Sequence, residues 1–171
     1  MKFVSVLPIA LVLLAGTSAS AETVKVNGPF TSTVEFGCLD SPIGLCTHGL
    51  LDGDLEGTYY FIFDSSGPAP TRKHPDRVVY TGRSIITLTS GEIIFGEDTG
   101  EMFTSNPFST PFVTTVQVVG GEGDFTNVRG RIVASGLINF PANFAVGSYR
   151  GKLKYSYDDD SDSDSDSDSD D

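Results

Sequence analysis

The chain has 171 residues and a formal net charge of −12, from 23 acidic and 11 basic residues. This balance argues against nucleic acid as a partner, because binding to a phosphate backbone requires a basic face. Nine of the acidic residues fall in the segment 158–171, which contains only Asp and Ser, so the rest of the chain is only mildly acidic.

The first 21 residues have the three parts of a secretory signal peptide. A basic N-terminus precedes an apolar run over residues 3–15 and a stretch of small residues that ends at Ala21. The apolar run is shorter than the roughly 20 residues that a helix needs to span a bilayer. We therefore expect cleavage after Ala21 and an exported mature chain, extracellular or periplasmic, with no membrane segment.

The chain contains two cysteines, Cys38 and Cys46. In an oxidising compartment a pair this close most simply forms one disulfide. Such a bond would stabilise the fold by about 2–3 kcal/mol on the chain-entropy model. A redox-active pair would favour C-x-x-C spacing, and a zinc site would need more ligands than His48 and His74 supply. We expect a structural disulfide and no metal site.

From residue 22 onward the sequence pattern is that of an all-β domain. Glycine and proline punctuate short apolar runs, and no stretch of helical length repeats with a 3.6-residue period. In the last predicted strand, mostly apolar residues at odd positions alternate with basic and hydroxyl residues at even positions, as on a half-buried strand. The predicted strands are 23–26, 30–36, 57–64, 77–89, 92–97, 112–119, 129–138 and 148–157.

About eight short strands favour a single antiparallel closed β-barrel over residues 22–157. Closing the sheet removes its exposed edges; a β-sandwich is the alternative. Two segments are expected to be surface loops. One is 65–76, which is rich in Pro and Gly and carries Arg72, Lys73 and His74. The other, 104–111, has too much proline for the interior of a β-ladder.

The stretch 118–130 joins two predicted strands and is dominated by glycine. Gly120, Gly121 and Gly123 let the backbone take positive φ and turn sharply where a side chain would clash. Phe125 is flanked by polar residues, and we expect its ring to fold back onto the core. The strand pattern resumes after the turn, which argues against a dinucleotide-binding loop, because such a loop leads into a helix.

This turn resembles the V-x-G-G-T-G-x-F-x-x-A-x-G turn of dirigent proteins, allene oxide cyclases and their secreted relatives. It departs from that pattern at Glu122 and Val128, where the pattern has Thr and Ala. The resemblance covers about residues 47–155 and implies the barrel fold of that family. The turn glycines, with Gly130, carry over as structural residues. The family's catalytic positions lie outside the turn, so none is transferred.

The resemblance also implies an apolar cavity inside the barrel. Allene oxide cyclases hold an apolar substrate there and dirigent proteins orient radical partners, and both need a few placed polar groups. The candidate lining residues are Tyr80, Phe95, Glu97, Tyr149 and Leu153. If Ile93, Phe95 and Glu97 face the interior, desolvation would raise the pKa of Glu97, making it the one catalytic candidate. Alternatively, Glu97, Asp98 and Glu101 line a solvated turn.

The sequence contains no signature of a known catalytic centre. It has no G-x-S-x-G, no H-E-x-x-H and no phosphate-binding loop with lysine. Arg83 lies on a threonine-rich strand face, which favours an outward side chain that bonds across the sheet; an inward, anion-binding arginine is the alternative. These observations favour a binding protein over an enzyme, with no cofactor.

The Asp/Ser segment 158–171 cannot bury a core and repels itself, so we expect it to be disordered. Asp160, Asp162 and Asp164 match the first ligand positions of an EF-hand loop. Ser165, however, replaces the required Gly, and the closing Glu is missing. We expect weak, collective cation binding by this tail. The tail could also fold back on Arg72-Lys73-His74 or on Arg150, Lys152 and Lys154.

The sequence favours an exported barrel that binds a small apolar ligand or forms part of an extracellular surface. One alternative is a dirigent-like or cyclase-like enzyme acting on an apolar substrate inside the barrel. Another is a structural or interaction protein that acts through its acidic tail. Oligomers are compatible with the resemblance, because dirigent relatives are often trimers. A cavity with a buried carboxylate would favour the enzyme, and a cavity without an ionisable group would favour a carrier.

Overall fold

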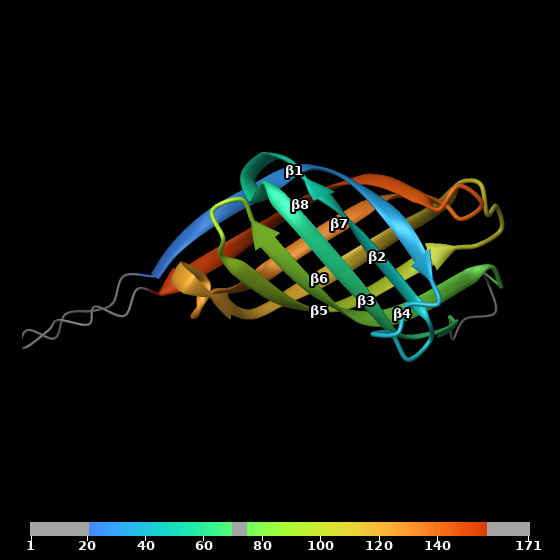
Figure 1. Ribbon diagram of the computed structural model, residues 1–171, viewed down its shortest axis with the longest axis horizontal. Coiled ribbons are helices and arrows are strands. Elements are labelled where there is room, and N and C mark those ends of the chain that lie inside the picture. Colours follow the sequence, from blue (N-terminus) through green and yellow to red (C-terminus); the bar gives the residue numbers. More distant parts are fainter. Residues whose placement is uncertain (1–20, 70–74, 157–171) are drawn as a thin grey trace, which may run out of the picture.

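The computed structural model describes residues 21–69 and 75–156, which form a closed antiparallel β-barrel (Figure 1). One-turn 3-10 helices, η1 (Gly53–Leu55) and η2 (Gly123–Phe125), follow the second and sixth strands. The strands are β1 (Ala21–Phe36), β2 (Leu45–Leu51), β3 (Gly57–Pro68), β4 (Arg77–Leu88), β5 (Ile93–Phe103), β6 (Thr110–Glu122), β7 (Arg129–Asn139) and β8 (Phe144–Ser156).

The barrel closes through its first and last strands. Each strand pairs with the next one along the chain. β1 then pairs with β8, from Ala21 opposite Ser156 to Thr33 opposite Phe144. This continuous ring confirms the predicted eight-stranded barrel and excludes the β-sandwich. No helix in the described part of the chain is long and apolar enough to cross a membrane.

β1 is one strand where the sequence predicted two, 23–26 and 30–36. The glycine and proline between them indicated a break, yet both pair with β8. The oxygen of Pro29 accepts a hydrogen bond from Asp52 N (3.1 Å), on the side where β2 has already ended at Leu51. A residue's N–H and C=O point to the same side of a strand. The missing N–H of Pro29 therefore removes no hydrogen bond between β1 and β8.

β2 was not predicted, because its seven residues contain a glycine and show no clear alternation of apolar and polar residues. The structure explains the glycine. A Cβ at Gly49 would lie closer than 3.0 Å to the backbone oxygen of Thr31 in the neighbouring strand. The residue that looks like a strand breaker is therefore required by the close approach of β1 and β2.

Several strands extend beyond their predicted ends. β5 continues to Phe103, β3 to Pro68 and β6 to Glu122. β6 also begins two residues earlier than predicted, at Thr110, so the predicted loop 104–111 is reduced to residues 104–109. Three predicted features lie outside the described residues. They are the signal segment up to residue 20, the basic triplet Arg72, Lys73 and His74, and the acidic tail 158–171.

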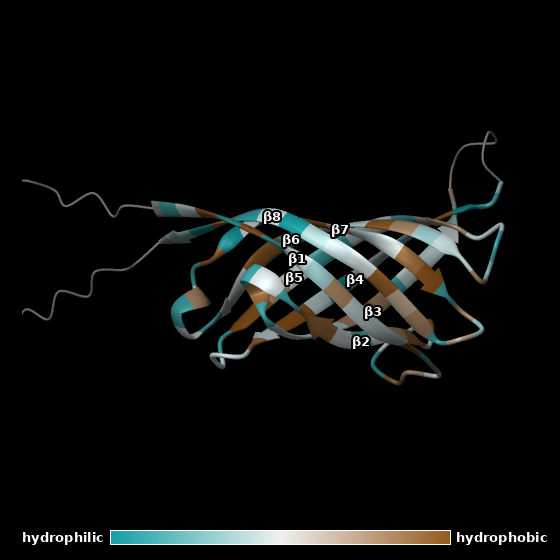
Figure 2. Ribbon diagram, turned by 90° about the horizontal axis from the view of Figure 1, so that it is seen from above, coloured by the Kyte–Doolittle hydropathy of each residue, from teal (hydrophilic) through white to brown (hydrophobic). Residues whose placement is uncertain are grey.

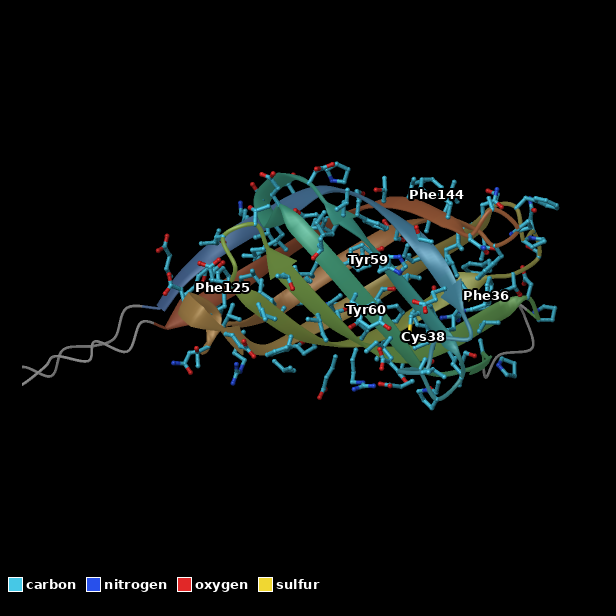
Figure 3. The ribbon with its side chains drawn as sticks, in the orientation of Figure 1. Phe36, Cys38, Tyr59, Tyr60, Phe125 and Phe144 are labelled. Carbon is cyan, nitrogen blue, oxygen red and sulfur yellow. A yellow bond between two sulfur atoms is a disulfide. The ribbon has the colours of Figure 1, made fainter. Side chains whose placement is uncertain are left out.

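One end of the barrel is filled by a packed layer of apolar side chains. Ile94, Val118, Val128 and Leu153 are each at most 1% exposed and belong to one core cluster. Phe125 of η2 packs against this layer, and its ring meets that of Tyr155 edge-on at 5.1 Å between centroids (Figure 3). The expectation that Phe125 folds back onto the core is confirmed.

The glycine turn places η2 between β6 and β7. Gly123 has a φ of 67° and begins η2. A Cβ at Gly121 would lie closer than 3.0 Å to the backbone oxygen of Ile93 in β5. Gly120 and Gly130 lie in the flanking strands β6 and β7. η2 and the three residues 126–128 separate these strands, so the chain re-enters the sheet as expected.

Cys38 and Cys46 form the predicted disulfide, with 5.8 Å between their Cα atoms. Both are buried, and the hydroxyl of Tyr60 lies 3.1 Å and 3.3 Å from their respective sulfur atoms (Figure 3). The same hydroxyl donates a hydrogen bond to Asp40 Oδ2 at 2.9 Å. The disulfide and the contacts of the Tyr60 hydroxyl together hold the loop between β1 and β2 against β3.

Replacing both cysteines, Cys38→Ser with Cys46→Ser, is expected to lower the free energy of unfolding by about 2–3 kcal/mol. The sequence separation of 8 closes a short loop, whose entropy the disulfide removes from the unfolded chain. Urea unfolding of both proteins, with and without reductant, measures the difference. Reductant should lower the free energy of unfolding of the wild type and leave that of the double variant unchanged. A loss below about 0.5 kcal/mol would contradict the expectation.

Candidate functional site: a cavity inside the barrel

The barrel encloses a cavity of about 90 Å³ directly above the packed layer. Its wall is mainly apolar, and seven aromatic side chains line it: Phe30, Tyr59, Phe61, Phe63, Tyr80, Phe112 and Tyr149. Positions along the strands show how the cavity wall and the packed layer are related. Three lining residues lie four positions from a packed-layer residue of the same strand: Asp98 from Ile94, Thr114 from Val118, and Tyr149 from Leu153.

Asp98 is the buried carboxyl group of this cavity. Its side chain is only 3% exposed, and its Oδ2 atom has no hydrogen-bond partner among the described residues. Burial raises the pKa of Asp98 to about 7; a hydrogen bond with Ser84 opposes the rise, and the negative charge of Asp64 adds to it. Asp98 can therefore exchange a proton near neutral pH.

The local sequence of β5 explains how the wall accommodates this carboxyl group. Gly96, Asp98 and Gly100 share the inner face, since side chains alternate along a strand. A Cβ at Gly96 would lie closer than 3.0 Å to Val116, and one at Gly100 would collide in the same way with the ring of Tyr80. The two glycines thus leave room for the side chains that flank Asp98.

Tyr80 places a hydroxyl group in the same part of the wall. Its Oη forms a hydrogen bond with Thr114 Oγ1, and either atom can be the donor. The ring is fixed by two aromatic neighbours, Phe63 at 5.1 Å and Phe61 at 6.0 Å between centroids. Burial raises the pKa of Tyr80 well above its ordinary value, so the phenol stays protonated.

A second polar group lines the cavity from β1, β2 and β3. It consists of Ser32, Thr47 and Tyr59, and the first two side chains are buried. Burial raises the pKa of Tyr59, while the neighbouring hydroxyl groups of Ser32 and Thr47 oppose the rise. Ser32 Oγ is itself buried without a hydrogen-bond partner among the described residues. In the order of the strands, these three hydroxyl-bearing side chains on β1, β2 and β3 are separated from Asp98 on β5. A bound molecule would therefore meet polar groups on two different parts of an otherwise apolar wall.

Two of the residues predicted to line a pocket point away from the cavity. Glu97 is exposed on the outer face of β5, between Arg83 of β4 and Gln117 of β6. Phe95 shares that outer face, because the buried residues of β5 are the even-numbered ones. The hypothesis that Phe95 and Glu97 face the interior is therefore wrong. The alternative of a solvated turn is also wrong, because Glu97, Asp98 and Glu101 all lie within β5.

The other three predicted pocket residues lie on the inner side of the barrel. Tyr80 and Tyr149 line the cavity, whereas Leu153 belongs to the packed layer beneath it. The hydroxyl of Tyr149 donates a hydrogen bond to the oxygen of Asp52 (2.7 Å) and accepts one from Leu55 N (2.8 Å). Tyr149 thereby fastens η1 to β8, and Leu55 contributes to the cavity wall.

Arg83 points outward, as the threonine-rich face indicated. Its Nε lies 3.1 Å from Asp64 Oδ1, and this ion pair bridges β4 and β3. The anion-binding alternative is thus excluded for this orientation. Among the described residues, no group of three or more His, Cys, Asp or Glu side chains is placed to hold a metal ion.

Comparison with known proteins finds structural similarity but no sequence relative. No protein-family model matches the sequence, and no curated protein matches it either. The solved structure of a pterocarpan synthase dirigent protein is similar over 81% of this chain and 88% of that chain, with 14% sequence identity and a TM-score of 0.36. The barrel assignment rests on the strand pairing of this chain itself.

Proposed function

We propose that this protein binds a small, mostly apolar molecule inside the barrel and holds it through a hydrogen bond to Asp98. The observation that carries the proposal is a buried carboxyl group whose Oδ2 has no partner among the described residues. Leaving a buried acceptor unpaired costs about 1–3 kcal/mol. A ligand hydroxyl placed against Oδ2 would remove that cost, while aromatic side chains would enclose the rest of the molecule.

The size of the cavity limits the ligand to about one small ring. An apolar cavity of about 150 Å³ holds benzene, and pockets for drug-sized molecules have about 300–1,000 Å³. The cavity here has about 90 Å³. Even a ring of the size of benzene would therefore require some movement of the lining side chains. A larger ligand would require more movement, so the proposed ligand class is a single small ring that carries a hydroxyl group.

The experiment compares 4-fluorophenol with fluorobenzene, which lacks the hydroxyl group, by ¹⁹F NMR titration at pH 8. Hydrogen bonds to a charged group contribute about 1.5–3 kcal/mol, so 4-fluorophenol should bind about 10- to 100-fold more tightly. Asp98→Asn should reduce this preference, whereas Glu97→Gln, which changes the neighbouring outward carboxylate, should preserve it. Equal affinity for the two probes, or binding of neither, would overturn the proposal.

A second function, catalysis by acid–base chemistry in a dirigent-like or cyclase-like enzyme, is favoured by the pKa of Asp98. A group that titrates near 7 is well matched to proton transfer at neutral pH. Cyclopentanone in D₂O provides a test, because the carboxylate would remove an α-proton and return a deuteron. Exchange faster than with Asp98→Asn favours the enzyme, and equal rates favour a carrier.

Export is part of the proposal. The Cys38–Cys46 disulfide supports an oxidising compartment, since disulfides persist in secreted and periplasmic proteins. The proposed signal peptide lies almost entirely outside the described residues, and cleavage after Ala21 would leave Glu22 as the first residue. A secreted barrel of this kind would act as a soluble carrier or as part of an extracellular surface.

A further inference from the structure

The outer surface of three adjacent strands, β1, β8 and β7, carries six exposed basic residues, which we call the basic face. Its members are Lys25, Arg129, Arg131, Arg150, Lys152 and Lys154. The register places Lys152 directly between Lys25 on one side and Arg131 on the other, and Lys154 opposite Arg129. The hydrophilic colouring of β8 in Figure 2 includes this part of the strand.

The basic face lacks counter-charges within the described part of the chain. Arg77 and Arg83, the other two basic residues described, form ion pairs with Glu101 and Asp64. None of the six residues of the basic face forms an ion pair with a described residue. Like charges directly opposite each other on neighbouring strands destabilise a sheet. An anion bound over this face would relieve that repulsion.

We propose that the occupant of the basic face is the acidic tail of the same chain, residues 158–171. The tail carries nine aspartates and no basic residue, so its charge is complementary to the six cations. It follows directly on β8, the central strand of the basic face, whose last described residue is Ser156. β1 begins and β8 ends at the same end of the barrel, on the left in Figure 1.

The length of the tail is sufficient for this contact. A fully extended segment of 14 residues spans about 46 Å, at about 3.3 Å for each residue. Along β8 the basic face runs from Lys154 to Arg150, which corresponds to about 13 Å. The tail can therefore turn back over β8 and reach all six cations. Because it is tethered beside them, its effective concentration is on the order of millimolar. The tail thus shields the basic face from external polyanions.

The direct test is zero-length carbodiimide cross-linking of the full exported chain, mapped by mass spectrometry. Aspartates from Asp164 onward are expected to link to Lys25, Lys152 or Lys154 within one chain. Asp158–Asp160 are excluded from the analysis because they are close to Lys154 in sequence. The links should disappear in 0.5 M NaCl, since salt screens exposed charges. Absence of intramolecular links at low salt, or links only between different chains, would overturn the proposal.

Binding of dextran sulfate gives an independent readout of shielding. A chain that ends at Tyr157 should bind this polyanion at least 10-fold more tightly than the full chain does. Changing Lys25, Lys152 and Lys154 to Gln in the shortened chain should remove most of that gain. These side chains are exposed, so the variant retains the packed core. Equal binding by the full and shortened chains would show that the tail does not occupy the basic face.

Discussion

Asp98→Asn is expected to remove a decline in stability that the wild type shows between about pH 4 and pH 7. The pKa of Asp98 is raised from 3.8 to about 7 in the folded protein, mainly by burial. Below pH 3.8 the group is protonated in both states. Between the two pKa values unfolding releases a proton, so the free energy of unfolding falls by up to about 1.4 kcal/mol for each pH unit.

The difference between the variant and the wild type should therefore grow in favour of the variant by on the order of 4 kcal/mol from pH 4 to pH 8. Urea unfolding at pH 4, 6 and 8 measures it. Glu97→Gln is the matched control, because it removes the adjacent carboxylate on the outer face. Its curve should run parallel to that of the wild type. A parallel curve for Asp98→Asn would contradict the assignment of Asp98 as a buried acid.

Leu153→Ala is expected to lower the free energy of unfolding by about 2–5 kcal/mol. Leu153 is completely buried in the packed layer, and the truncation would leave a void among neighbours that are themselves tightly packed. Chemical unfolding at one pH measures the loss. Val146→Ala, at an outward position that is 38% exposed, should change the stability by less than about 0.5 kcal/mol.

This comparison separates a core role from the pocket role considered for Leu153. A pocket residue can be truncated with little loss of stability, because the cavity already lacks neighbours on that side. A loss below about 1 kcal/mol for Leu153→Ala would therefore contradict its place in the packed layer. A loss of about 2–5 kcal/mol would instead identify Leu153 as part of the packed layer beneath the cavity.

The closed barrel could be predicted because its evidence is local and repeated along the chain. Frequent turns, short apolar runs and the glycine stretch 118–130 all favoured a meander that closes on itself. The strand β2 was missed for a physical reason. Gly49 is needed where β1 approaches closely, and that approach is a tertiary contact that the local sequence does not reveal. Pro29 was similarly interpreted as a break although it interrupts no bond to β8.

The candidate site was harder to predict because β5 has apolar side chains on both faces. Ile93 and Phe95 indicated one face, and Ile94 and Met102 occupy the other, so alternation alone could not decide which side is buried. The carboxyl group that lines the cavity therefore belongs to Asp98, and not to its neighbour Glu97 as expected. A signal was present: an acid between two glycines at i−2 and i+2 leaves space on its own face for larger neighbours.

The packed layer closes the interior of the barrel at one end, beneath the cavity. The residues of this layer are at most 1% exposed, so within the described part of the chain no continuous passage runs past Ile94, Val118 and Leu153. A polysaccharide or peptide strand therefore cannot be threaded through and handled unit by unit. A molecule bound in the interior, as we propose, would therefore enter and leave on the same side of the packed layer.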